Sequence, residues 1–232
     1  FASTQSLYGI SDSNKPLEED SSAKNPITTY ALSKWKAEIE LRKLSSDDFS
    51  LVIFRPSTVF GSSPRMRCDI VFNNFIGNAY TSNKILIRSN GKPFRPAIHV
   101  NDVCSAFIAG IEAPRELINN QVFNVGFLGG NYSVLNLANY AKKTVKNSKI
   151  EILNETGHDE RTYIVSFDKI LKILKDFYSP IWDLENGGEE IIQFFESINF
   201  TKHQLNGWET NRLIQIKRLQ KLKLIDKELK LI

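Results

Sequence analysis

The 232 residues predict an α/β protein in which parallel strands alternate with helices. One observation is the order of the first elements: a strand-like opening, a helix, and a short apolar strand at 50–55 bounded by proline. This is the pattern of a parallel crossover unit. The other observation is composition, because hydrophobic residues at 41% and charged residues at 24% are those of an ordinary globular protein.

Apolar spacing and turn residues predict the elements in order. Residues 1–8 form the end of a strand, which reaches a turn at Gly9 and a polar loop over 10–25. Pro26 suits the first turn of a helix that runs to about Leu44. Later helices are expected near 69–80, 102–112, 133–145, from 166 onward and at 183–199, and later strands at 121–125 and 149–153.

Two local features follow from turn and capping chemistry. Strands at 84–88 and 94–99 are predicted to pair as a hairpin because an Asn-Gly pair joins them. Asn101 or Asp102 is expected to cap the next helix, with His99 as a structural residue near its start.

Charge and cysteine usage limit the partners. The net charge is +4, and the segment from Thr201 onward holds eight basic and three acidic residues, so the excess belongs to the tail. We interpret this tail as an amphipathic packing helix rather than a contact for nucleic acid or an acidic membrane. No apolar run approaches the ~18 residues of a membrane span, so neither partner is expected. Cys68 and Cys104 lack metal-like spacing, which favours free thiols, no metal site and a reducing cytoplasm.

The most informative pattern is Tyr30 followed by Lys34 in the predicted helix. Helical residues four apart lie one above the other on the same face. A cation beside a phenol favours its ionised form, so such a pair is suited to proton transfer. The spacing alone is weak evidence, because Tyr80 and Lys84 repeat it in a turn-like segment. A half-buried tyrosine beside a solvated lysine is the structural alternative.

Three further motifs accompany this pair, at residues 3–9 (STQSLYG), 55–61 (RPSTVFG) and 95–103 (RPAIHVNDV). With these four ordered motifs, residues 1–200 resemble the extended short-chain dehydrogenase/reductase family, specifically its nucleotide-sugar epimerases and dehydratases. The resemblance implies a doubly wound, Rossmann-like parallel sheet that binds NAD, or NADP as the alternative. It also implies a smaller α/β domain for the nucleotide sugar.

The resemblance implies a role for each matching residue. Tyr30 would be the catalytic base or acid, and Lys34 would bind the nicotinamide ribose and assist ionisation of the phenol. Thr4 matches a residue that hydrogen-bonds the reacting sugar hydroxyl. Pro56 matches the proline whose loop lines the nicotinamide pocket, so Tyr30, Lys34 and Pro56 form the expected cofactor contacts. The structural alternatives are a strand-end hydroxyl at Thr4 and ordinary strand termination at Pro56.

Substrate contacts are implied for Thr4, Thr58, Arg95 and Arg161. Thr58 stands where many relatives have an asparagine, so it departs from the family pattern. Arg95 and Arg161 match arginines that grip the nucleotide diphosphate, a task suited to the planar guanidinium fork. Surface ion pairs are their structural alternative.

The two residues after Thr4 bear on the reaction. Dehydratases of this family usually have an acid pair there, and Gln5 and Ser6 cannot act as carboxylic acids. We therefore predict that the parent protein epimerises a nucleotide-activated sugar by transient oxidation at C4. A 4,6-dehydratase or keto-sugar reductase is one alternative, and a non-catalytic nucleotide-sugar-binding module is another. A homodimer through the helix of Tyr30 is also an expectation.

The family's glycine-rich pyrophosphate turn is expected upstream of Phe1, so we interpret the chain as a shortened piece. Gly126 to Gly130 follow a strand and precede a helix, but Ser133 opens that helix too far away for a tight turn. The predicted organisation is the remaining NAD-binding domain at 1–65, a mainly sugar-binding region at 66–200 with some elements returning to the NAD domain, and a basic helical tail at 201–232.

Overall fold

Strands and helices alternate through most of the computed structural model, which describes residues 1–11, 15–155 and 162–232. The strands are β1 (Val52–Pro56), β2 (Thr58–Phe60), β3 (Lys84–Ile87), β4 (Phe94–His99), β5 (Gln121–Val125), β6 (Asn131–Ser133) and β7 (Lys149–Ile152). The helices are the 3-10 turn η1 (Gln5–Tyr8), α1 (Thr29–Leu44), α2 (Val71–Ser82), α3 (Val100–Glu112), α4 (Arg115–Ile118), α5 (Val134–Thr144), α6 (Asp168–Ile173), α7 (Leu184–Ser197), α8 (Lys202–Leu205) and α9 (Arg212–Lys221). The predicted α/β class is confirmed.

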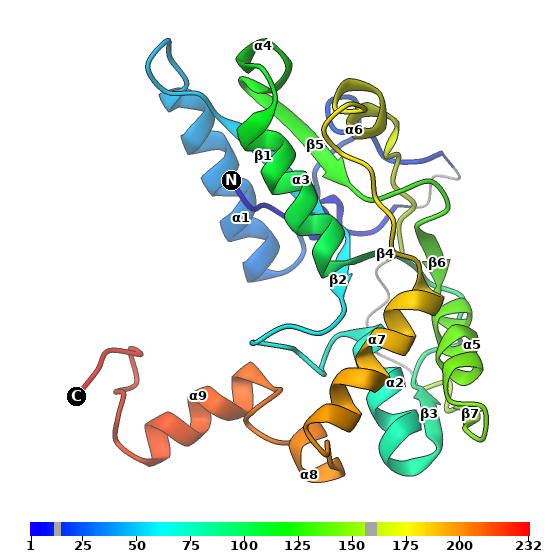
Figure 1. Cartoon of the computed structure of the whole chain (residues 1–232). Coiled ribbons are helices and arrows are strands. Elements are labelled where there is room, and N and C mark those ends of the chain that lie inside the picture. The colour runs from blue at the N-terminus through cyan, green and yellow to red at the C-terminus, as the bar shows by residue number, and fades with distance from the viewer. Residues whose placement is uncertain (12–14, 156–161) are drawn as a thin grey trace.

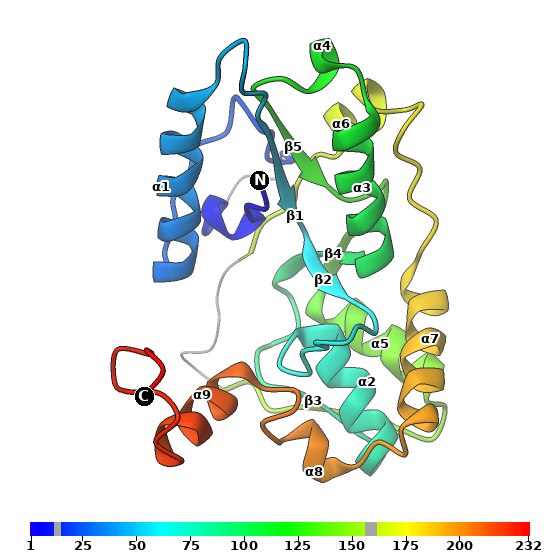
Figure 2. The same cartoon turned by 60° about the vertical axis from the view of Figure 1, so that its left-hand side comes forward.

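A parallel sheet occupies the upper half of the molecule in Figure 1. β1 pairs in parallel with β5, and Ala2 makes a parallel bridge to Phe54 on the opposite edge of β1. Helix α1 connects these two strand positions, so the predicted crossover unit is confirmed. Figure 2 shows β1 and β5 between α1 on one side and α3 with α6 on the other.

Alternation of side chains along β1 explains this layering. Ile53 packs in a small cluster with Leu51, against which Leu41 of α1 lies. Phe54 points to the other face, where its ring lies 5.0 Å from that of Phe107 in α3. Gly110 permits this approach of α3, because a Cβ there would lie 2.6 Å from Phe54 Cε2. The apolar cluster on this side, called the upper cluster below, includes Leu7, Phe54, Ala106, Phe123, Val125, Tyr163 and Tyr178.

Two further sheets lie below the first. β2 and β4 are parallel, β4 and β6 are antiparallel, and β3 pairs in parallel with β7. Helices α2, α5 and α7 pack against one another beside these strands (Figure 1). They enclose a second apolar group, the lower cluster, which includes Phe60, Met66, Cys68, Phe72, Phe75, Ile76, Leu137, Ile191 and Phe195.

The predicted hairpin between 84–88 and 94–99 is wrong. β3 pairs with β7, whereas β4 pairs with β2 and β6. Gly91 does form a local turn with a φ of +77°, but burial decides the partners. β3 buries only Ile85 and Ile87, both in the lower cluster, while β4 is buried along nearly its whole length between two other strands.

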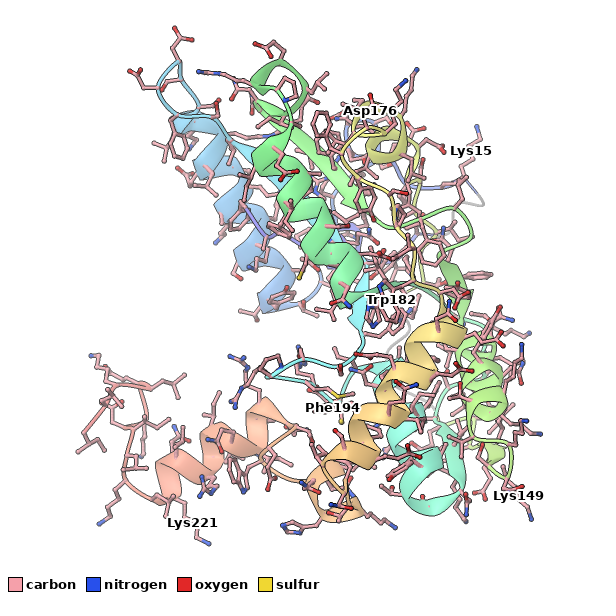
Figure 3. All side chains as sticks on the ribbon, viewed as in Figure 1. Lys15, Lys149, Asp176, Trp182, Phe194 and Lys221 are labelled. Atoms are coloured by element: carbon pink, nitrogen blue, oxygen red, sulfur yellow. The ribbon has the colours of Figure 1, made fainter. Side chains whose placement is uncertain are left out.

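The expected cap at the start of α3 is also wrong. His99 is the N-cap, since its Nδ1 accepts a hydrogen bond from the Asn101 amide at 3.3 Å. The carboxylate of Asp102 instead accepts bonds from the amides of Ile181 and Trp182, both at 3.1 Å. The interpretation of His99 as structural is confirmed, and Figure 3 shows Trp182 where the start of α3 meets α7.

The last helix of the basic tail does not pack against the rest of the chain as an amphipathic helix was expected to do. Helix α9 forms, but none of its ten residues is buried, and it projects away from the body in Figure 1. Its Arg218 guanidinium instead lies over the Trp208 ring at 4.2 Å. Among the described helices, none combines the length and apolarity that a membrane span needs.

Candidate active site

Thr4 lies where the first strand position ends and the chain turns. It is the N-cap of η1, and its Oγ1 accepts a hydrogen bond from the Ser6 amide at 3.1 Å. The same oxygen also lies 3.1 Å from the Ser6 hydroxyl. The Thr4 side chain is therefore held by its own turn, at the end of a strand where parallel α/β sheets commonly bind ligands.

Tyr30 and Lys34 share one face of α1, as their spacing predicts. Tyr30 stands in the first turn and is 54% exposed. The Lys34 ammonium lies 5.9 Å from the centre of the Tyr30 ring. Its Nζ also donates to the Ala2 carbonyl at 2.8 Å. Lys34 thus links α1 to the strand that leads into Thr4.

A cavity of about 1020 Å³ brings most of the candidate residues together. Its walls include Thr4, Tyr30, Pro56, Thr58 and Arg95. Lys34 stands beside Tyr30 without lining this cavity, and Arg161 falls outside the described residues. Ligand pockets typically enclose about 300–1,000 Å³, so this one can hold a ligand as large as a nucleotide sugar.

A buried ion pair behind the cavity was not predicted. Arg55 and Glu38 are joined by two hydrogen bonds of 2.6 and 3.0 Å, and both side chains are at most 2% exposed. Ser3 donates its hydroxyl to the same carboxylate, and Arg55 donates to the Tyr8 hydroxyl at 3.1 Å. Burial raises the pKa of Tyr8 to about 12, although Arg55 lowers it. This network therefore connects α1 and β1 to the residues on both sides of Thr4, Ser3 before it and Tyr8 in η1.

The two positions after Thr4 face different surroundings. Gln5 is buried, and its Nε2 donates to the Arg55 carbonyl at 3.0 Å. Its Oε1 accepts from the Ser57 hydroxyl at 3.2 Å. Ser6, in contrast, lines the cavity. Neither position supplies a carboxylic acid there.

Three more arginines line the cavity: Arg65, Arg67 and Arg88. Sequence reasoning missed them, since no motif marks their segments. One available signal was the alternation of charged and apolar residues at 65–68.

The described residues fit the nicotinamide end of an NAD site. Tyr30 and Pro56 line the cavity, and Lys34 offers an ammonium beside them. The Gly126 to Gly130 stretch does not make a phosphate turn, because it leads into β6 before α5 begins. Gly126 instead packs against Phe167, whose ring would lie 2.2 Å from a Cβ at that position.

A parallel α/β sheet whose strand ends meet a large cavity defines this chain as a Rossmann-like protein. The family described as NAD dependent epimerase/dehydratase matches residues 1–126. The chain belongs to this family of enzymes. A curated relative, dTDP-D-glucose 4,6-dehydratase of Dictyostelium discoideum, is 25% identical over 158 aligned residues, which cover 64% of this chain and 34% of that protein.

Solved structures share the fold. UDP-glucose 4-epimerase of Thermotoga maritima, solved with UDP-glucose, has a TM-score of 0.74 and 22% identity, with 86% of this chain and 63% of that one covered. UDP-glucuronic acid 4-epimerase of Bacillus cereus, in complex with UDP-glucuronic acid and NAD, has a TM-score of 0.71 and 22% identity, with 85% and 60% covered. dTDP-glucose 4,6-dehydratase of Bacillus anthracis, in complex with NAD, has a TM-score of 0.70 and 21% identity, with 84% and 60% covered. The chain thus spans less than two thirds of each of these relatives.

Proposed function

We propose that the protein containing this chain is an NAD-dependent epimerase that acts on a nucleotide-activated sugar by transient oxidation at the sugar C4. The observation that supports this most is the convergence of Thr4, Tyr30 and Arg95 on one cavity. A hydroxyl and a phenol suit a reacting sugar carbinol, and a guanidinium suits a diphosphate.

Each residue has a separate task in this proposal. The Tyr30 hydroxyl, once ionised, takes the proton of the sugar 4-hydroxyl and later returns it. Thr4 Oγ1 hydrogen-bonds the same sugar hydroxyl and orients it, while Arg95 and Arg161 bind the diphosphate. Lys34 places its ammonium beside the phenol and holds the ribose of the cofactor, with Pro56 along the nicotinamide. When bound, NAD supplies the acceptor for the hydride of C4.

The residues after Thr4 favour epimerisation over 4,6-dehydration. Elimination of water needs an acid beside the sugar, and the buried Gln5 and the Ser6 hydroxyl cannot provide one. A purely binding role is less well supported. A binding site has no need for an exposed Tyr30 phenol with an ammonium beside it.

The test is product analysis with the full-length protein and NAD. UDP-glucose, UDP-glucuronic acid and dTDP-glucose are each incubated, and the nucleotide sugars are separated by chromatography. We expect the C4 epimer of one substrate and no net accumulation of NADH. A 4-keto-6-deoxy product, or stoichiometric consumption of NADPH, would replace the proposal with the dehydratase or the reductase.

A further inference from the structure

Helix α7 is held in a defined position beside the strands that lead into the cavity. Just before α7 begins, the Asp102 carboxylate accepts a hydrogen bond from the Trp182 amide at 3.1 Å. The Trp182 ring stacks on that of His99, with 4.1 Å between the ring centres. Gly187 permits a close approach to β2, because a Cβ there would lie 2.5 Å from Phe60 Cε2. Figure 2 shows α7 beside the end of β2.

Glu190 lies one turn after Gly187 and therefore on the same face of α7. Its Oε2 accepts a hydrogen bond from the Ser62 amide at 3.0 Å, and its Oε1 accepts one from the Ser62 hydroxyl. His99 Nε2 lies 3.5 Å from Oε2. Because His99 Nδ1 accepts from the Asn101 amide, the neutral ring carries its proton on Nε2 and donates it to Glu190. One carboxylate thus joins α7 and β4 to the segment that follows β2.

This segment, residues 61–70, forms one wall of the cavity. The residues of the wall that line the cavity are Gly61, Ser63, Arg65, Arg67, Asp69 and Ile70. Asp69 raises the pKa of the Arg67 guanidinium, and Tyr30 contributes to the same shift from across the cavity. The wall therefore borders the phenol at which the sugar would react.

Hydrogen bonds hold the wall near both of its ends. At the far end, Asn73 donates to the Arg67 carbonyl at 2.9 Å, and the Cys68 amide donates to the Thr210 carbonyl at 3.2 Å. At the near end, Asn73 accepts from the Gly61 amide at 3.1 Å. The carboxylate of α7 supplies the other contacts at this end, so its loss should loosen the wall without detaching it.

The reacting groups are supported by other contacts. Thr4 is held by its own turn, through the bond from the Ser6 amide. Helix α1, which carries Tyr30, is joined to β1 by the buried Glu38–Arg55 pair. These contacts do not involve α7. A looser wall should therefore leave Thr4 and Tyr30 in place.

We propose, on the basis of the proposed function, that Glu190 is a positioning residue that keeps the 61–70 wall ordered for the nucleotide sugar. An ordered wall loses little freedom when the ligand binds, whereas a loosened wall must be ordered at the expense of affinity. Glu190 acts through Ser62, and neither residue belongs to the cavity lining. Its loss should therefore change KM rather than kcat.

Steady-state kinetics of the full-length protein test this, with the nucleotide sugar that product analysis identifies. We expect Glu190→Ala to raise KM about tenfold while kcat stays within about twofold. Glu190→Gln should behave like the unaltered protein, because its oxygen accepts from the Ser62 amide and its NH2 group can donate to the Ser62 hydroxyl. Glu189→Ala, exposed on the same helix, is the matched control and should change neither constant.

Trypsin gives a local measurement that needs no turnover, since it cleaves after the exposed Arg65 and Arg67 of the wall. We expect Glu190→Ala to be cleaved faster at these two bonds, because the wall opens more often. Cleavage after the exposed Lys36 of α1 should keep its rate. Mass spectrometry of the fragments separates the sites, and Glu190→Gln should again match the unaltered protein.

The contrary outcomes are distinct. An unchanged KM in Glu190→Ala overturns the inference while the proposed function stands. Unchanged cleavage at Arg65 and Arg67 overturns it as well, because the wall would then not depend on Glu190. Faster cleavage at every site, with a lower kcat and the same KM, would mean that Glu190 only stabilises the fold. Absence of turnover by the unaltered protein contradicts the proposed function and, with it, the positioning role.

Discussion

At the scale of residues, the proposed chemistry depends on one phenol. Tyr30→Phe removes only the hydroxyl of a residue that is 54% exposed, so the free energy of unfolding should change by less than about 0.5 kcal/mol. We expect kcat to fall by about 10²–10⁴-fold, the usual contribution of a positioned acid or base. Tyr80→Phe, at the second Tyr-x-x-x-Lys position, is the control and should retain activity. Full turnover by Tyr30→Phe would exclude the role given to Tyr30.

A second residue-level prediction concerns the buried Glu38–Arg55 pair. Glu38→Gln leaves the Arg55 charge without its partner in the interior, so we expect a loss of about 3–5 kcal/mol in the free energy of unfolding. Glu40→Gln, on the same helix, breaks an exposed pair with Lys43 and should change stability by at most about 0.5 kcal/mol. Urea denaturation of both variants measures the difference. Equal losses of stability in the two variants would mean that the buried pair contributes no more than the exposed one.

His99 makes stability depend on pH. Burial lowers its pKa, although Glu190 acts in the opposite direction, and its Nδ1 must be unprotonated to cap α3. The unfolded state therefore binds a proton more readily, so the His99 contribution to stability is lost as pH falls through about 6.5. Burial raises the pKa of Asp102, which works against this trend.

A comparison between pH 7.5 and 5.5 isolates this effect. We expect the stability difference between the unaltered protein and His99→Asn to shrink at the lower pH, because asparagine caps a helix without titrating. A difference that stays constant across this range would show that His99 does not titrate differently in the two states.

At the scale of elements, α3 tests how helix and sheet fit together. Gly110→Ala would place a Cβ 2.6 Å from a ring carbon of Phe54, which is fully buried and cannot move aside. Overpacking of this kind costs about 1–3 kcal/mol of stability. The better helix propensity of alanine offsets only part of this cost. Cys104→Ala, exposed on the same helix, is the control and should be nearly neutral. Thermal unfolding of the two variants measures the difference. A Gly110→Ala variant as stable as Cys104→Ala would show that the contact between α3 and Phe54 is not that tight.

The sequence predicted those helices and strands whose signal lies within their own residues. The periodicity of α1 and the apolar run of β1 gave their positions within a few residues, and with them the shared face of Tyr30 and Lys34. The hairpin failed because an Asn-Gly turn does not decide which strand a neighbour pairs with. The Glu38–Arg55 pair was missed because it joins residues 17 apart on a helix and a strand. Such pairings depend on tertiary packing, which a single sequence does not display.

At the scale of the whole molecule, the cavity joins the two apolar clusters. Tyr163 of the upper cluster and Phe75 of the lower cluster both line it, as do Tyr30 from above and Arg88 from below. The family resemblance pointed to five residues of the cavity wall, namely Thr4, Tyr30, Pro56, Thr58 and Arg95. The arginines at 65, 67 and 88 could be assigned to the wall only from the folded structure, which brings their segments together. The division of the chain at residues 65 and 200 stays a prediction.

A ligand that spans both clusters should stabilise the molecule as a unit. At a nucleotide-sugar concentration of 100 times Kd, binding only to the folded state raises the free energy of unfolding by about 2.7 kcal/mol. We therefore expect the substrate identified by product analysis to raise the urea midpoint of the full-length protein by this free energy divided by the m value. Free sugar without the nucleotide should give no shift. At the same ligand concentration, Arg95→Ala should lose most of the stabilisation, because the diphosphate would lack its buried guanidinium. Undiminished stabilisation of Arg95→Ala would place the diphosphate elsewhere and remove the main support for the substrate class.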